Sequence, residues 1–260
     1  MALRLSTALR NALNTQGSFR SLMSNCVLKV YSGAQPATAD AAPTGTLLVT
    51  YSLAGGALTR ETLATGSVAL TGGGSGSVNT LTVNGLEVMG SATNFNTSLI
   101  QTATDMVTKI NNNPKNQLWV ASNLGGTVAT VTLTANPGLG ALANGLTVAS
   151  TATTITKTDT NTSGGVTAVN GLNWLWPSAS GVISKDTGTW QGTAVATGTA
   201  GWFRFEAAVT DPGTADSSFV ILRMDGAVAT TGAELNMGST AIVNGAVQTI
   251  SNFSVTLPTA

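Results

Sequence analysis

The first part of the chain carries a stripe of apolar side chains with the period of an α-helix. The stripe consists of Leu5, Ala8, Leu9, Ala12 and Leu13. Arg4 lies on the opposite side of the predicted helix, and Arg10 lies near the edge of the stripe. Gly17 is a plausible stop signal. The pattern therefore predicts an amphipathic helical segment within residues 1–24.

Two roles for this segment are compatible with the sequence. An amphipathic helix can pack its apolar face on the domain that follows it, or it can serve as a terminal arm that docks on a partner subunit. Residues 1–39 carry four basic and no acidic side chains, because the first acidic residue is Asp40. The docking hypothesis assigns the contact with the partner to Leu5, Leu9, Leu13, Arg4 and Arg10.

After this segment, apolar and polar positions alternate in short runs, which is the period of β-strands. Strands are predicted at 26–31, 46–53, 181–185, 189–196, 201–209, 219–224 and 249–257. Turn residues separate them, including Asp211-Pro212-Gly213 and Asp225-Gly226. Many short strands divided by turns predict a mainly β fold, with an antiparallel β-sandwich or jelly-roll-like domain.

Residues 66–165 show a different pattern, which predicts an inserted small α+β module of the form ββαβββ. A strand pair is expected within 78–89, and the clearest helix of the chain is expected over 98–112. Thr97 or Ser98 can cap the start of this helix. Three further strands are predicted at 117–122, 127–134 and 145–149.

Two stretches of small residues border this module and are interpreted as flexible linkers. One is the Gly/Ser-rich run at 67–77, and the other is the Thr/Ser-rich run at 150–165. Residues 25–65 and 166–260 would then form one β-sandwich domain. Strands before and after the insert should pair with each other, because an isolated hairpin is marginally stable in water.

Composition and charge limit the function further. The chain has 260 residues, with 11 Lys+Arg against 11 Asp+Glu, and only 8% of its residues are charged. About 25% is usual. A neutral chain lacks the basic surface of a nucleic-acid-binding protein. Its apolar runs fall well short of a membrane span, and arginines interrupt the apolar part of a possible signal peptide. We therefore expect no nucleic-acid partner and no membrane span.

The residues that carry catalysis in most enzymes are scarce. The chain has no histidine and one cysteine, which excludes a His-based triad, a His-held metal and a Cys-cluster zinc site. Asp211, Asp216 and Asp225 flank predicted loops without the spacing of a calcium loop or an evident glycosidase pair. Arg204 and Glu206 share one face of a strand and are expected to form a solvated, neutralised pair. We expect no enzyme activity, no metal and no cofactor.

Aromatic residues gather in the C-terminal half of the chain, and in a β domain such clusters usually belong to the core. The cluster consists of Trp174, Trp176, Trp190, Trp202 and Phe203. Trp174 and Trp176 are expected on the same side of an extended segment just before a proline. As exposed side chains they could anchor a subunit contact. Stacking on a sugar would also need a polar cluster, which the sequence does not reveal.

Four stretches of the chain resemble structural proteins of tailed bacteriophages. They are ALRLSTALRNAL (2–13), CVLKVYSGAQPATADAAPTGTLLVTYSL (26–53), TWQGTAVATGTAGWFRF (189–205) and GAELNMGSTAIVNGAVQTISNFSVTLP (232–258). Together they cover about half of the chain. Within the insert, LTVNGLEVMG (81–90) and the helix ending in KINNN look like modules that recur in phage tail-associated proteins.

The resemblance implies a place in the virion and a role in assembly, without catalytic residues. It implies a protein made in the host bacterial cytoplasm and present as a homo-oligomer at the neck or tail, as an adaptor, collar or fibre-attachment component. Its partners would be portal, neck, tail or capsid proteins. Two alternatives stay open, a capsid decoration protein and a glycan-binding or host-surface-binding adhesion module. Composition alone fits a bacterial adhesin equally well.

Overall fold

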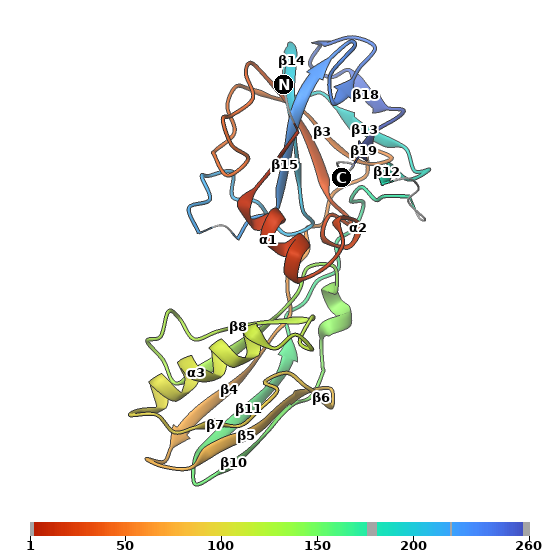
Figure 1. Cartoon of the computed structure of the whole chain (residues 1–260). Helices are drawn as coiled ribbons and strands as arrows, with labels where there is room; N and C mark the ends of the chain where they lie inside the picture. The colour runs from red at the N-terminus through yellow and green to blue at the C-terminus, as the bar shows by residue number, and fades with distance from the viewer. Residues whose placement is uncertain (1–2, 176–180, 219, 257–260) are drawn as a thin grey trace. The chain divides into compact units, whose positions relative to one another are not determined.

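The computed structural model describes residues 3–175, 181–218 and 220–256 of the chain. It shows a mainly β protein with antiparallel sheets and few helices (Figure 1). The predicted mainly β, sandwich-like class is confirmed.

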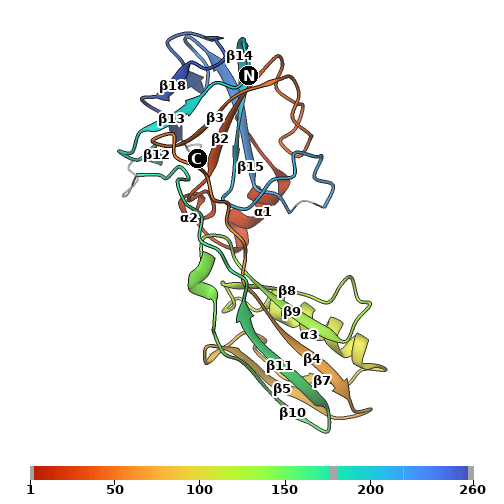
Figure 2. The ribbon, with the colours of Figure 1, turned by 180° about the vertical axis from the view of Figure 1, so that it is seen from behind.

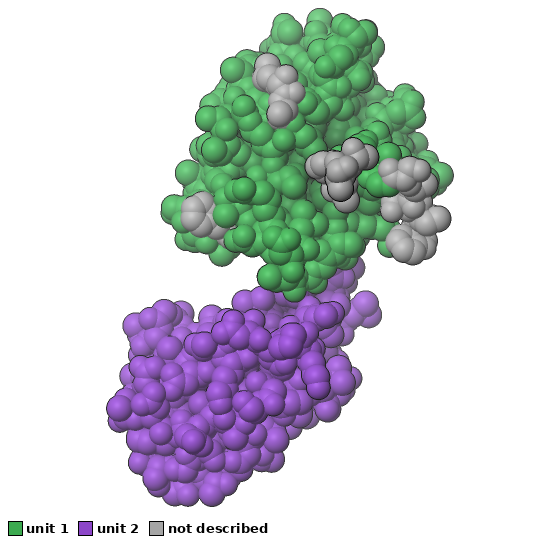
Figure 3. Space-filling model, viewed as in Figure 1, with its two compact units in different colours: residues 1–61, 168–260 green, residues 62–167 purple. Residues whose placement is uncertain are grey.

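The chain folds into two compact units, coloured separately in Figure 3. Unit 1 combines residues 1–61 with residues 168–260, and unit 2 comprises residues 62–167. The predicted insert at 66–165 lies within unit 2. The N-terminal segment belongs to unit 1 and does not form a separate arm.

Unit 1 is built on a mostly antiparallel sheet that has nine strands in the described part of the chain. Its strands are β1 (Arg4–Leu5), β2 (Val27–Ser32), β3 (Leu47–Leu53), β13 (Trp190–Thr193), β14 (Gly198–Glu206), β15 (Arg223–Ala229), β16 (Leu235–Asn236), β17 (Ala241–Ile242) and β18 (Val247–Ile250). They run in the order β1-β15-β14-β2-β3-β13-β18, with β16 beside β15 and β17 beside β14. Strands from both sides of the insert therefore pair, β2 with β14 and β3 with β13.

Two short helices and a small second sheet complete unit 1. The helices are α1 (Thr7–Thr15) and α2 (Phe19–Leu22), and the second sheet pairs β12 (Val182–Ser184) with β19 (Ser254–Thr256). One hydrophobic core joins all of these elements. At its centre, the rings of Trp174, Trp190, Phe203, Phe205 and Phe253 contact one another.

Unit 2 contains two four-stranded sheets in its described residues, with one helix packed against them (Figure 2). The first sheet has the order β11-β4-β9-β8, and the second has the order β10-β5-β6 with β7 beside β5. The elements are β4 (Thr65–Gly72), β5 (Ser77–Val83), β6 (Leu86–Glu87), β7 (Thr93–Asn94), α3 (Leu99–Asn112), β8 (Trp119–Ser122), β9 (Thr130–Ala135), the 3-10 helix η1 (Gly140–Ala143), β10 (Val148–Thr153) and β11 (Thr156–Ser163).

Helix α3 confirms the predicted helix at 98–112. The side chain of Ser98 accepts a hydrogen bond from the backbone N–H of Gln101 at 3.1 Å and so caps the helix. Ala103, Met106 and Ile110 are buried on the face that packs against the first sheet. The apolar period of the sequence therefore corresponds to the buried face of this helix.

The interpretation of the two small-residue runs as linkers is wrong. Both runs form paired strands, because the first run covers most of β4 and the second covers β11 and part of β10. Glycines occur here because two turns approach each other closely. Gly76 has a φ of 91°, and a Cβ atom there would lie 2.0 Å from the carbonyl oxygen of Thr153. Small residues in this place allow packing and are not a sign of flexibility.

Two predictions in unit 1 need correction. Asp225-Gly226 is not a turn, since both residues lie in the middle of β15, which begins at Arg223 rather than at 219. Asp225 can lie in a buried strand because an arginine on the neighbouring strand neutralises its charge. The N-terminal helix is also shorter than predicted. Arg4 and Leu5 form strand β1 and pair with β15, and α1 ends at Thr15.

Candidate functional site: a buried ion-pair network in unit 1

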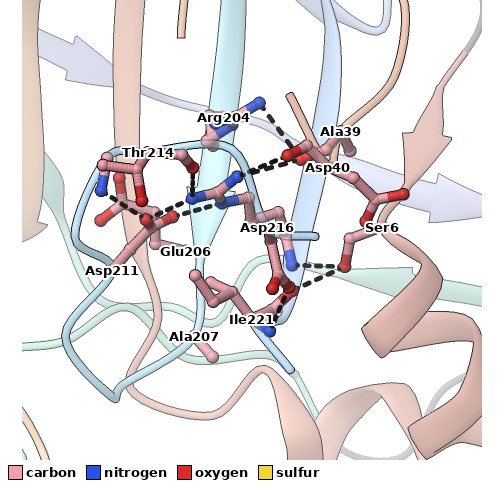
Figure 4. Close-up of polar contacts among 12 residues, drawn as sticks. Ser6, Ala39, Asp40, Arg204, Glu206, Ala207, Asp211, Thr214, Asp216 and Ile221 are labelled. Atoms are coloured by element: carbon pink, nitrogen blue, oxygen red, sulfur yellow. Dashed lines mark hydrogen bonds and ion pairs between the residues drawn. The ribbon is translucent and has the colours of Figure 1, made fainter. Parts of the chain in front are cut away.

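The most unusual chemical feature of the described chain is a group of charged side chains inside unit 1 (Figure 4). Arg204 on β14 lies directly opposite Asp225 on β15 in the strand register. Its Nε and Nη2 atoms donate to the two carboxylate oxygens of Asp225 at 2.8 and 2.7 Å. Both side chains are at most 1% exposed. The pair is therefore bidentate and desolvated, which is the strong form of such a contact.

A second arginine joins two loops to the same strand. The Nε and Nη2 atoms of Arg223 each donate to the carboxylate of Asp211 at 2.6 Å. Nη2 also donates to the carbonyl oxygen of Thr214 at 2.8 Å. Nη1 donates to the backbone carbonyls of residues 39–41 at 3.2–3.4 Å. One guanidinium thus holds the loop after β2 and the loop after β14 against β15.

The start of helix α1 is attached to this network. Asp40 accepts hydrogen bonds at 2.8 Å from the backbone N–H and the hydroxyl of Thr7, at the first turn of the helix. The hydroxyl of Ser6 donates to the carbonyl oxygen of Ile221 at 2.9 Å and accepts from the backbone N–H of Arg223 at 3.0 Å. The capping residues of the helix therefore also connect it to β15.

Glu206 forms a separate ion pair with two basic residues from other parts of unit 1. Its carboxylate contacts Lys29 on β2 at 2.6 Å and also contacts Arg60. The predicted solvated pair of Arg204 with Glu206 is therefore wrong. Both side chains are buried, and each has its own partner on a neighbouring strand or loop. The alternation of side chains along β14 places Arg204 and Glu206 on one face of the sheet, but the register with neighbouring strands decides which charged residues pair.

The aspartates of the network differ in their affinity for protons. Burial raises the pKa of Asp211, but the hydrogen bonds from Arg223 and from the N–H of Gly213 outweigh burial and hold that pKa below its ordinary value. Burial raises the pKa of Asp225 above its ordinary value, against the opposing hydrogen bonds from Arg204. The extra backbone donor and a less enclosed position at a loop account for the lower pKa of Asp211.

Both ion pairs of this arrangement are closed by bidentate hydrogen bonds. The carboxylates of Asp211 and Asp225 are both occupied by arginines, so neither is poised to exchange a proton with a ligand. Asp216 accepts from the backbone N–H of Ile221 at 2.7 Å and holds its own loop. The sequence identified the three aspartates as separate loop residues. It did not show that Arg223 binds Asp211 and Arg204 binds Asp225, because these partners lie far apart along the chain or on different strands.

The residues assigned to docking lie on unit 1 itself. Leu9 is fully buried, and Leu5 and Leu13 pack against the core of the unit. Arg4 donates to the carbonyl oxygen of Pro36, and the exposed Arg10 donates to the hydroxyl of Thr7. Of the two roles that the sequence left open, packing on its own domain is the one observed. The apolar stripe is not a free surface for a partner.

The proposed interface role of Trp174 is also corrected. Its side chain is 3% exposed, and its indole N–H donates to the carbonyl oxygen of Met23 at 2.9 Å. It packs edge-on against Phe19 and Trp190, with ring centroids 5.2 and 5.5 Å away. Trp174 is therefore a core residue. Trp176 lies outside the described residues.

A pocket opens on the described surface of each unit. The pocket in unit 1 has a volume of about 710 Å³ and is lined largely by hydroxyl and amide side chains between β16 and β19, together with Lys185 and Glu234. The pocket in unit 2 has a volume of about 460 Å³ and lies beside α3 at Asp105 and Lys109. The aspartates of the ion-pair network line neither of them.

Comparisons with known proteins identified no relative of this chain. No family model, no curated protein and no solved structure matches the chain. Among residues 3–175, 181–218 and 220–256, no group of three or more carboxylate, histidine or cysteine residues is placed to hold a metal ion. The helices within these ranges are too short or too polar to cross a membrane.

Proposed function

We propose that the protein is a non-enzymatic structural component of a tailed-phage virion. It is present in several copies at the neck or tail, where it serves as an adaptor, a collar or an attachment point for fibres. One observation carries the proposal. The four stretches that resemble phage structural proteins all belong to unit 1, and they contain most of its paired strands, including β2, β3, β13 and β14. These four stretches thus fall in one folded unit, while the tail-like segments of the insert, 81–90 and the helix ending in KINNN, lie in unit 2.

The chemistry of the ion-pair network supports a building role. Arg204 and Arg223 hold two loops against the central strands through charged hydrogen bonds, and Asp40 and Ser6 connect the start of α1 to them. Such contacts restrict the loops to one arrangement, and buried polar groups of this kind can give conformational specificity. A virion component needs a fixed surface so that many copies make the same contacts.

The adhesion alternative has less support. A glycan-binding module usually presents an aromatic ring beside polar groups, so that the ring stacks on the sugar. The tryptophans of the described chain are at most 6% exposed. The polar pocket of unit 1 is lined by one aromatic residue, Phe253, which is also buried. The described tryptophans and the unit 1 pocket thus offer no exposed ring for a sugar. The partly exposed Phe95, beside Asn94 and Asp105 in the unit 2 pocket, is the one aromatic residue of the two pockets that is not buried.

Deletion of the coding sequence from the genome that encodes this chain tests the proposal. We expect particles that lack density at the neck or tail in cryo-EM maps, and restoration of that density when the full chain is supplied in trans. A tagged full chain should be detected in purified particles at a fixed copy number. Density restored on the capsid lattice instead would identify a decoration protein. Particles of unchanged composition and infectivity without the chain would refute the virion role.

A further inference from the structure

Strand β18 is an unprotected edge of the main sheet. Val247–Ile250 pairs with β13 on one side, and no strand in the described chain pairs with its other side. Backbone hydrogen bonds in an antiparallel ladder alternate in direction, so about half of the N–H and C=O groups of β18 point away from β13. An edge of this kind is a template for a further strand.

The sequence around β18 lacks the devices that keep sheet edges apart. Natural proteins protect exposed edges with charged side chains, prolines or bulges. The last charged residue of the chain is Glu234, so none of residues 235–260 carries a side-chain charge. Residues 243–254, which include β18 and both flanks, contain no proline. The protein has 11 positive and 11 negative side chains, but none of them lies in this region, so no like charges would repel a strand that approaches β18.

Apolar side chains are exposed beside the same edge. Val195, Val243 and Val247 are 58–60% exposed. They lie close together because Ala194, next to Val195, exchanges backbone hydrogen bonds with Gly245 and Ala246 at 2.9 Å. A strand added to β18 would gain backbone hydrogen bonds and, from Val247 in β18 itself, apolar contact.

Space for an added strand lies next to β18. The 710 Å³ pocket is lined by Gln248, Thr249 and Ile250 on one side and by residues 236–239 on another, whereas no residue of β13 lines it. The two charged residues of the lining already have partners. Lys185 donates to two carbonyl oxygens at 2.7 and 2.8 Å, and Glu234 accepts from the N–H of Ala227 at 2.9 Å. The groups left to meet a ligand are neutral, which matches an uncharged peptide strand.

A second copy of the same strand satisfies these requirements. Antiparallel pairing of β18 with itself about a two-fold axis at Thr249 places Thr249 opposite its own copy and Gln248 opposite Ile250. Uncharged and β-branched cross-strand pairs are favourable, whereas a charged residue near such an axis would face its own like charge. The strand is therefore compatible in charge with a second copy of itself.

We infer that β18 is a homotypic contact, at which two copies of the chain join their main sheets edge to edge. The inference rests on the proposed assembly role, because it names one contact of that assembly. It explains both the exposed valines near β18 and the absence of charged side chains in the C-terminal region. The contact forms through backbone hydrogen bonds and requires no change in the described fold.

Mass photometry and analytical ultracentrifugation of the full chain test this contact. We expect a concentration-dependent species at twice 26.1 kDa. Thr249→Lys, which places like charges near the axis, should weaken the association at least tenfold. Thr249 is exposed, so this variant should retain the fold of the monomer. Thr231→Lys is the matched control, because it adds the same charge at an exposed loop position of unit 1 and should associate like the unchanged chain.

Hydrogen exchange of the same samples locates the contact. Amides of β18 should become protected as the protein concentration rises, and this protection should be lost in Thr249→Lys. Dimers that are unaffected by Thr249→Lys, or a chain that stays monomeric up to about 100 μM, would overturn the inference. Specific saccharide binding in the pocket with no dimer would also overturn it. A dimer lost in Thr249→Lys, with particles unchanged by gene deletion, would instead retain the contact and reject the virion role.

Discussion

Removal of one partner from the Arg204–Asp225 pair should destabilise unit 1 far more than removal of both. The two side chains are at most 1% exposed and share hydrogen bonds of 2.7 and 2.8 Å. Asp225→Leu leaves a buried guanidinium without its counter-charge, which costs about 3–5 kcal/mol in comparable buried pairs. The double variant Arg204→Met/Asp225→Leu replaces both charges with apolar side chains of similar size. Such replacements are often neutral or stabilising. We expect the double variant to be at least about 2 kcal/mol more stable than the single variant.

Urea unfolding followed by tryptophan fluorescence measures this difference in the full chain. Trp119 in β8 is the one tryptophan of unit 2, and every other tryptophan belongs to unit 1. A Trp119→Phe background in all variants therefore makes the fluorescence a report on unit 1. Hydrogen exchange of β4 and β9 in the same samples provides an internal control, because these strands belong to unit 2 and should keep their protection.

The comparison between the single and double variants decides whether the uncompensated charge causes the loss of stability. Equal destabilisation by Asp225→Leu and by the double variant would mean that the uncompensated charge is not the source of the cost. The loss would then come from side-chain packing at position 225, since Asp225→Leu keeps Arg204 and its donor to the carbonyl oxygen of Ala39. Arg204→Met alone supplies the fourth corner of the cycle and should be destabilising because it leaves Asp225 buried.

Three further outcomes are expected. The pKa of Asp211 is lowered in the folded state, so its contribution to stability should be complete above the ordinary pKa of 3.8 and should decline as the pH falls through the folded pKa. Acid unfolding of Asp211→Asn, followed by circular dichroism, should lack this pH-dependent loss of stability. Gly76→Ala should destabilise unit 2 by more than about 1 kcal/mol in thermal unfolding, because Gly76 has a positive φ and its Cβ position lies against the carbonyl oxygen of Thr153. The control Gly74→Ala should be neutral or slightly stabilising, because no heavy atom lies within 4 Å of the added Cβ. Cys26 is fully buried and its thiol pKa is raised by burial, so it should react with a thiol reagent only after unfolding; rapid labelling of the native chain would contradict its core position.

Features that depend on neighbouring residues were predictable from the sequence. The apolar period over 98–112 gave helix α3, and the capping role of Ser98 followed from its side chain. Alternating positions gave β2, β3 and β14 close to their observed bounds. The change of pattern near residue 66 indicated the insert, because strand and helix periods are local properties of the chain.

Features that depend on distant partners were not predictable. A buried Asp225 in mid-strand has the local appearance of a turn residue, and only the opposing Arg204 explains its position. Gly76 has the local appearance of a linker residue, and only the approach of Thr153 explains it. The ion-pair network therefore escaped detection, although each of its aspartates had been noted. Its partners meet through sheet register, which short-range patterns do not encode.

The insertion of unit 2 within unit 1 has a consequence for the order in which the chain folds. Unit 2 is continuous in sequence, and Thr62 exchanges backbone hydrogen bonds with Val166 at 3.0 and 3.1 Å. During synthesis it can fold before the second half of unit 1 exists. Once unit 2 is folded, its two ends lie close together, so that β3 and β13 are connected by a much shorter effective loop. Loop-closure entropy makes this worth about 1 kcal/mol. We therefore expect the folded insert to favour the meeting of the two halves of unit 1, so truncations within it should impair folding of a unit whose own residues are intact.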